Sequence, residues 1–152
     1  DGGFLGAEDS DYVPYIDTCD KIHAQTNVAY EMFPNFITPT DTSGYPAILF
    51  WPKGLRETEF EWTQLAPKWP GDEKPDYWNE QETSFDSIMD EDFQNLEPMQ
   101  RSHDAGVFES MPLNYQERRI YYYHQVIDDW IGRDNLPENI QVPNVLDPFI
   151  EV

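Results

Sequence analysis

The stretch SFDSIMDEDFQNLEPMQRSH, residues 84–103, combines a helical apolar pattern with many acidic residues. Wound at about 100° per residue, it gathers one apolar stripe, made of Phe85, Ile88, Met89, Leu96 and Met99. Asp92 falls near the centre of this stripe, whereas Asp86, Asp90, Glu91 and Glu97 project away from it. Burying an isolated carboxylate costs several kcal/mol unless it is paired or binds a cation. The pattern therefore predicts a partner for Asp92: an arginine, backbone donors or a metal ion. Alternatively, Pro98 breaks the period and the stripe is drawn wrongly.

The residues before this stretch predict an antiparallel sheet. β-Branched and aromatic residues alternate in three segments, Asn27–Phe33, Ala47–Trp51 and Phe60–Leu65. The intervening TPTDTSG and PKGLRET read as turns, and the proline-rich residues 66–81 read as a loop. The helix itself is expected over Phe85–Gln100, with a kink or an end near Pro98.

A second helix is predicted over residues 115–131. Asn114 and Glu117 make a capping pair, and Gly132 is placed to end the helix. Its apolar stripe, which includes Ile120, Ile127 and Ile131, is expected to cover the sheet. Residues 106–113 suggest one more short strand, residues 1–26 an irregular lead-in, and residues 134–152 an extended tail. The fold class is α+β, in one domain spanning residues 1–152, with a curved antiparallel sheet gripping a helix.

Composition excludes several classes of function. With 30 acidic residues against 9 lysines and arginines, the net charge is −21, so nucleic acid is not expected as a partner. No apolar run reaches the length of a membrane span, and no secretory signal is visible, so a cytoplasmic protein is expected. A single cysteine, Cys19, excludes an internal disulfide and a cysteine-based metal cluster held by this chain.

The three histidines show no metal-ligand spacing. His124 reads as a core histidine on the apolar face of the second helix, and His103 lies near the end of the first. His23 lies in the lead-in. The sequence contains no glycine-rich phosphate loop and no nucleophile motif.

Four segments, taken in order, resemble a known family. The four segments are YEMFPNF, GYPAILFWPKG, EDFQNLEPMQRS and PLNYQERRIYYYHQVIDDWIG. They are similar to the C-terminal part of the catalytic domain of Rieske-type non-heme iron oxygenases, the α subunits of aromatic ring-hydroxylating enzymes. The similarity covers roughly Asn27 to the end. It implies a helix-grip (START/Bet v 1-like) fold and a mononuclear Fe(II) held by two histidines and one carboxylate. The residue that aligns with that carboxylate is Asp92.

The resemblance also implies parts that the chain lacks. The family's two histidine ligands come from an upstream His-x4-His motif, and its [2Fe-2S] Rieske cluster from upstream Cys and His pairs. The chain is therefore either a C-terminal fragment of a longer oxygenase or a family member that has lost its iron. It opens on Asp1 rather than Met, which favours the fragment, and in either case we expect it to be inactive alone. Implied partners are O2, a small organic substrate such as an aromatic compound, an electron-donating ferredoxin or reductase, and further subunits in a homotrimer or hetero-oligomer. Candidate pocket residues, each equally consistent with plain core, are Phe33, Phe50, Trp51 and Met99.

Two other classes of function stay open. A helix-grip cavity without a metal would make a small-molecule-binding module, and an acidic structural or subunit-contact domain is the third possibility.

Overall fold

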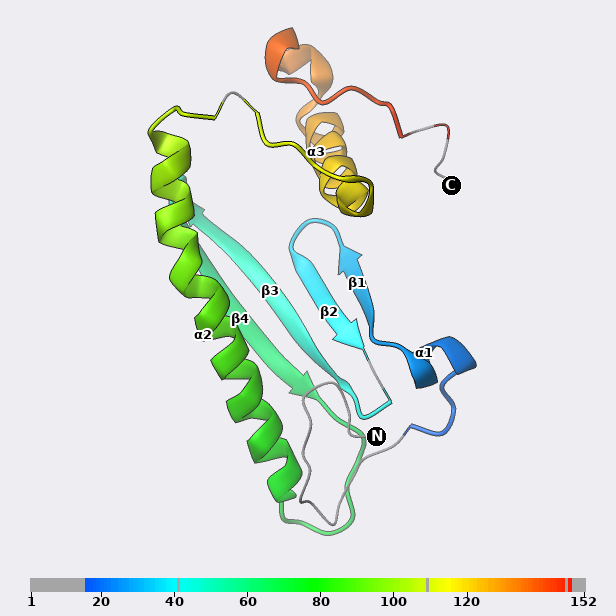
Figure 1. Cartoon of the computed structure of the whole chain (residues 1–152). Helices are drawn as coiled ribbons and strands as arrows, with labels where there is room; N and C mark the ends of the chain where they lie inside the picture. Colours follow the sequence, from blue (N-terminus) through cyan, green and yellow to red (C-terminus); the bar gives the residue numbers. More distant parts are fainter. Residues whose placement is uncertain (1–15, 41, 109, 147, 149–152) are drawn as a thin grey trace. The chain divides into compact units, whose positions relative to one another are not determined.

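The computed structural model describes residues 16–40, 42–108, 110–146 and 148, and the chain divides into two compact units, residues 1–101 and 102–152 (Figure 1). The first unit holds the sheet and most of the long helix α2, and the second holds helix α3. In chain order the helices and strands are α1 (Lys21–Gln25), β1 (Val28–Met32), β2 (Phe36–Thr40), β3 (Tyr45–Gly54), β4 (Glu57–Leu65), α2 (Asp76–Asp104) and α3 (Arg118–Ile131).

The sheet is a four-stranded antiparallel meander in the order β1-β2-β3-β4. The three predicted strands are present, but β2 was missed, because its threonines and Pro39 were read as a turn. Only Phe36 and Ile37 of β2 pair with β3, whereas Pro39 pairs with Ala29 of β1 alone. The missing backbone N–H of Pro39 therefore removes no hydrogen bond between β2 and β3. The described sheet and helices confirm a mixed α and β protein with an antiparallel sheet and a C-terminal helix.

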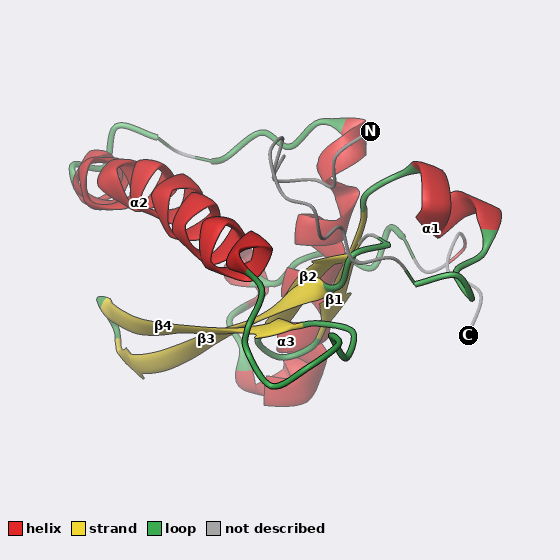
Figure 2. Ribbon diagram, turned by 90° about the horizontal axis from the view of Figure 1, so that it is seen from below, coloured by secondary structure: helices red, strands yellow, loops and turns green. Residues whose placement is uncertain are grey.

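Helix α2 lies along one face of β3 and β4 (Figure 2). The ring of Phe85 lies 4.4 Å from that of Trp62, and the ring of Phe93 lies 4.9 Å from that of Phe60. Trp62 also donates its indole N–H to Asp86 at 3.0 Å. The alternation predicted for β4 is confirmed, since Phe60 and Trp62 are half-buried between exposed neighbours. These aromatic contacts join the helix to the sheet.

Helix α2 is longer than predicted at both ends. Residues 76–81 were expected to be a loop, but Tyr77 and Trp78 are only 1% exposed, so tertiary burial stabilises helix there. The helix also continues through Pro98 to Asp104. Proline removes one backbone hydrogen bond to Gln94, and because Gln94 is exposed, water can satisfy the freed carbonyl.

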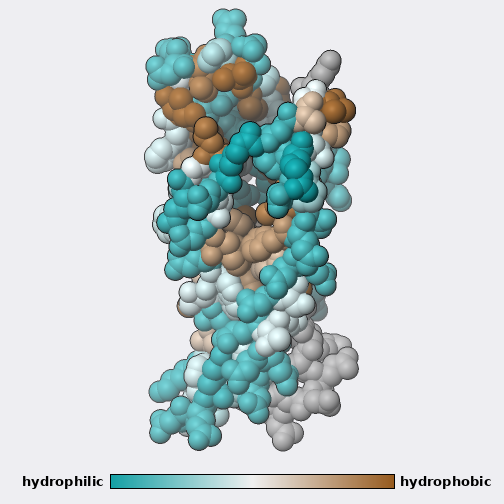
Figure 3. Space-filling model, turned by 90° about the vertical axis from the view of Figure 1, so that its left-hand side faces the viewer, coloured by the Kyte–Doolittle hydropathy of each residue, from teal (hydrophilic) through white to brown (hydrophobic). Residues whose placement is uncertain are grey.

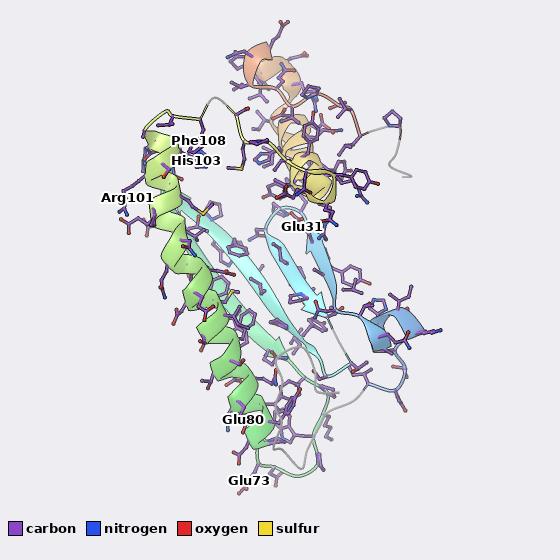
Figure 4. The ribbon with its side chains drawn as sticks, viewed as in Figure 1. Glu31, Glu73, Glu80, Arg101, His103 and Phe108 are labelled. Atoms are coloured by element: carbon purple, nitrogen blue, oxygen red, sulfur yellow. The ribbon has the colours of Figure 1, made fainter. Side chains whose placement is uncertain are left out.

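Several charged residues near the two ends of α2 have the sign that suits its dipole, whereas Asp104 at its last position and Lys74 before its start do not. Glu73 and Glu80 lie near its N-terminal end, and Arg101 and His103 lie near its C-terminal end (Figure 4). Acidic groups at the start and basic groups at the end are each worth a few tenths of a kcal/mol to about 1 kcal/mol.

In the second unit, the local signals for α3 are confirmed but its buried face was predicted wrongly. Asn114 and Glu117 form the reciprocal capping box, and Gly132, with φ of 87°, ends the helix. The predicted stripe is largely exposed, with Ile120 46% and Ile131 50% exposed. The described residues of 106–113 form no strand.

The buried side of α3 faces the residues that follow it. Gln125 and Asp128 are buried, and Asp128 accepts the backbone N–H of Val142 at 2.6 Å. Tyr121 donates its hydroxyl to the carbonyl of Pro143 at 2.7 Å, and Arg133 donates to the carbonyl of Val142 at 2.8 Å. The segment expected to be extended thus contains the 3₁₀ turns Arg133–Asn135 and Glu138–Ile140 and folds back on α3.

Among the described residues, no helix combines the length and the hydropathy needed to cross a membrane.

Replacing Phe85 by alanine is expected to lower the free energy of unfolding by about 3–5 kcal/mol, because its ring is 3% exposed and packs on Trp62. Urea unfolding of the chain measures the loss. Ile88→Ala, on the same helix but 37% exposed, is the matched control and should cost less than about 1.5 kcal/mol. Equal losses for the two variants would mean that α2 is turned differently on the sheet.

Asp128→Ala is expected to cost about 1–3 kcal/mol, because it leaves the N–H of Val142 without its acceptor beside α3. Asp134→Ala, an exposed position in the turn after α3, should change stability by less than about 0.5 kcal/mol. Urea unfolding compares the two variants, and a neutral Asp128→Ala would show that the tail is not held by this carboxylate.

Candidate functional site

Asp92 lies on an exposed part of α2 rather than among buried residues. The side chains that pack on the sheet are Phe85 and Phe93, and Met89 between them is half-buried. At about 100° per residue these three span an arc whose centre lies roughly 60° from Asp92. The predicted stripe omitted Phe93, and its centre was therefore placed too close to the carboxylate.

The neighbours of Asp92 on this flank of the helix are apolar and exposed. Ile88 is 37% exposed, Leu96 54% and Met99 52%. With Asp92 they sit at spacings of three, four and seven residues, which place them on one side of a helix. We call these four residues the Asp92 face. The rest of the surface of α2 is largely hydrophilic in the view of Figure 3.

The carboxylate of Asp92 makes no hydrogen bond or ion pair among the residues that the structure describes. A partner for Asp92 was predicted because burying an isolated carboxylate is costly. That desolvation cost does not arise here, because an exposed carboxylate remains solvated. Its oxygens are therefore available to an incoming cation.

The described residues do not complete a metal site. Within that part of the chain, no three His, Cys, Asp or Glu side chains come together at a distance that could hold a metal ion. A mononuclear iron with two histidines and a carboxylate does not fit these residues alone. Asp92 can supply one ligand, and the others would have to come from outside the described residues.

The four candidate pocket residues do not share one surface. Phe50 pairs with Phe60 across β3 and β4, with ring centroids 5.5 Å apart, and so faces α2. Trp51 points to the other face of the sheet, where its indole N–H donates to Glu61 at 3.0 Å. Phe33 is half-buried in the turn after β1, and Met99 belongs to the Asp92 face. Their role as pocket walls stays a prediction.

Each of the three histidines contacts an aromatic ring close to it in the sequence. His124 is exposed beside Tyr123, so the prediction of a core histidine was wrong, and His103 contacts the ring of Phe108. His23 lies between Asp20 and Tyr30, a cluster that the sequence analysis missed. The available signal was Asp20 three residues before His23, the spacing of a helix N-cap and its first turn.

Asp92→Asn is expected to change the free energy of unfolding of the chain by less than about 0.5 kcal/mol, because the carboxylate is exposed and unpaired among the described residues. Urea unfolding at neutral pH measures the difference. A loss above about 1 kcal/mol would indicate a structural partner for Asp92, and Asp90→Asn provides the matched control on the opposite side of the helix.

Comparison with known proteins places the chain in a family. The family model of the ring hydroxylating alpha subunit (catalytic domain) matches residues 9–133, which include the sheet, all of α2 and α3. No curated protein and no solved structure matches the chain. The match begins earlier than the resemblance at Asn27 suggested and ends at residue 133 rather than at the end of the chain, and it covers most of the 152 residues. The chain belongs to the ring-hydroxylating α-subunit catalytic-domain family, a family of oxidoreductases.

Proposed function

We propose that the chain is part of the catalytic domain of an iron-dependent oxygenase, in which Asp92 is the carboxylate ligand of a mononuclear Fe(II). The observation that carries the proposal is the family match over residues 9–133, with an exposed and unpaired carboxylate at the position that resembles the family's iron-binding motif. The substrate would be a small organic molecule, such as an aromatic compound, that receives oxygen from O2.

The ligand set would be completed by two histidines from outside the described residues. Asp92 and the two histidines would hold the ion, and Fe(II) bound by them would supply the redox chemistry that activates dioxygen. The chain by itself would then be inactive. The electrons would come from a [2Fe-2S] Rieske cluster upstream of this chain, and a ferredoxin or reductase would reduce that cluster. The subunit would assemble into a homotrimer or hetero-oligomer.

The Asp92 face suggests what the chain's own residues contribute. Asp92 offers a solvated anionic ligand, and Leu96 and Met99 place apolar surface one and two turns further along the helix. Apolar side chains next to the ligand would contact an organic substrate and exclude water from it. Of the four candidate pocket residues, Met99 is the one that shares a helix face with Asp92.

In an oxygenase subunit that contains this chain together with the two histidines, Asp92→Ala should remove about one iron per subunit and abolish product, because one of three ligands is lost. Iron is measured by metal analysis of the purified protein, and product by chromatography. The visible absorption of the Rieske cluster should be unchanged.

Asp90→Ala and Glu91→Ala are the matched controls for this experiment. Both are exposed acidic residues of α2, but they point roughly 160° and 100° away from Asp92 around the helix. Each should keep its iron and its activity. If Asp92→Ala also keeps both, the iron-ligand assignment is wrong, and a metal-free small-molecule-binding module becomes the better description.

A further inference from the structure

Three side chains form a hydrogen-bonded chain where α1 meets β1, in the first unit. Nδ1 of His23 lies 2.9 Å from Oδ1 of Asp20, and Nε2 of the same ring lies 2.5 Å from the hydroxyl of Tyr30. The rings of His23 and Tyr30 are nearly parallel, at 11°, with centroids 5.9 Å apart. The imidazole therefore bridges a carboxylate and a phenol through its two nitrogens.

The surroundings of Asp20 decide which nitrogen of the imidazole carries the proton. Asp20 caps α1 by accepting the backbone N–H groups of Ile22 at 2.9 Å and His23 at 3.0 Å. The backbone N–H of His23, followed by its side chain, holds the pKa of Asp20 below its ordinary value. An ionised carboxylate accepts only, so Nδ1 of the neutral ring carries the proton. Nε2 is then left to accept the hydroxyl of Tyr30.

The phenol is accessible to a small molecule. Tyr30 is 44% exposed, and the side chain of His23 is 29% exposed. Glu31, the next residue of β1 (Figure 4), points to the opposite face of the sheet because strand side chains alternate. Its carboxylate therefore does not lie on the side of the strand where Tyr30 meets His23.

We propose that Tyr30 is a nucleophile that takes an acyl group from activated carboxylic esters, with His23 as its general base and Asp20 as the residue that positions the imidazole. A nucleophile within hydrogen-bond reach of a base that is itself oriented by a third group is the arrangement that activates hydroxyls in many unrelated proteins. The site is separate from Asp92 and does not depend on iron.

The reaction balances with these three residues and the ester. The Tyr30 oxygen forms a bond to the ester carbonyl carbon while its proton moves to Nε2 of His23. The bond from that carbon to the leaving alcohol then breaks, and Nε2 returns the proton to the departing oxygen. The products are O-acyl-Tyr30 and the free alcohol, with no oxidant or reductant required.

The experiment incubates the 152-residue chain with p-nitrophenyl acetate, records release of p-nitrophenol by absorbance, and locates acetyl groups by peptide mass spectrometry. Tyr30 should be acetylated at least about tenfold faster than Tyr122, a tyrosine of similar exposure at 40%, because general-base assistance is typically worth that much or more. Equal rates at the two tyrosines would overturn the proposal.

Two variants distinguish a reactive tyrosine from a purely structural stack of His23 on Tyr30. Tyr30→Phe should abolish the fast phase, and His23→Gln, which can still hydrogen-bond the phenol, should slow acetylation of Tyr30 by about tenfold or more. A His23→Gln chain that reacts like the parent overturns the proposal. So does a Tyr30→Phe chain that releases p-nitrophenol equally fast with the acetyl group on His23. Circular dichroism checks that each variant is folded.

Asp20→Asn tests the positioning role without removing the helix cap, since asparagine caps helices as well as aspartate. An unassisted phenol reacts through its phenolate, so its rate rises about tenfold per pH unit below pH 10. The parent should show a shallower rise between about pH 7 and 9, and Asp20→Asn should be slower and steeper. Identical profiles for the two chains would remove Asp20 from the mechanism.

Discussion

The contact between Trp62 and helix α2 determines how the first unit is arranged. The indole packs on Phe85 at 4.4 Å and donates its N–H to Asp86 at 3.0 Å, so two adjacent helix residues are held by one strand residue. A contact to one position would leave α2 free to rotate about its axis, whereas contacts to adjacent positions, about 100° apart, restrict that rotation. The second aromatic pair, Phe60 and Phe93, holds the helix two turns further along.

The rotation of α2 about its axis determines how exposed the carboxylate of Asp92 is. With Phe85 and Phe93 on the sheet, the carboxylate lies at the flank of the contact and stays exposed. A rotation that carried Asp92 to the centre of the contact would bury it and cost several kcal/mol without a partner. Aromatic packing on one side of the helix therefore keeps the carboxylate of Asp92 accessible on the adjacent side. In the same orientation of the helix, the apolar side chains of Leu96 and Met99 are exposed.

Local signals in the sequence predicted the strands around Val28, Ile48 and Trp62 and the cap at Asn114, because alternation and capping depend on neighbouring residues only. The start of α2 and the strand β2 could not be predicted in this way. Tyr77 and Trp78 are helical where they are buried, and Trp78 lies beside Gly44, which is distant in the sequence. Pro39 is tolerated because that end of β2 has no β3 partner. The candidate ligand was identified by resemblance, but its exposure depends on which aromatic residue of β4 meets which residue of α2.

The same helix can therefore serve two purposes that substitutions can separate. Its sheet-facing residues, such as Phe85, contribute stability in proportion to the apolar surface they bury. The carboxylate of Asp92 makes no hydrogen bond or ion pair among the described residues, so its replacement is expected to change stability no more than that of another exposed position. The family match is the reason to propose a functional role for a carboxylate flanked by exposed apolar side chains. A single carboxylate is too weak a ligand to select a transition metal alone, so under the proposed function the specificity of an iron site at Asp92 would come from the groups that join it there.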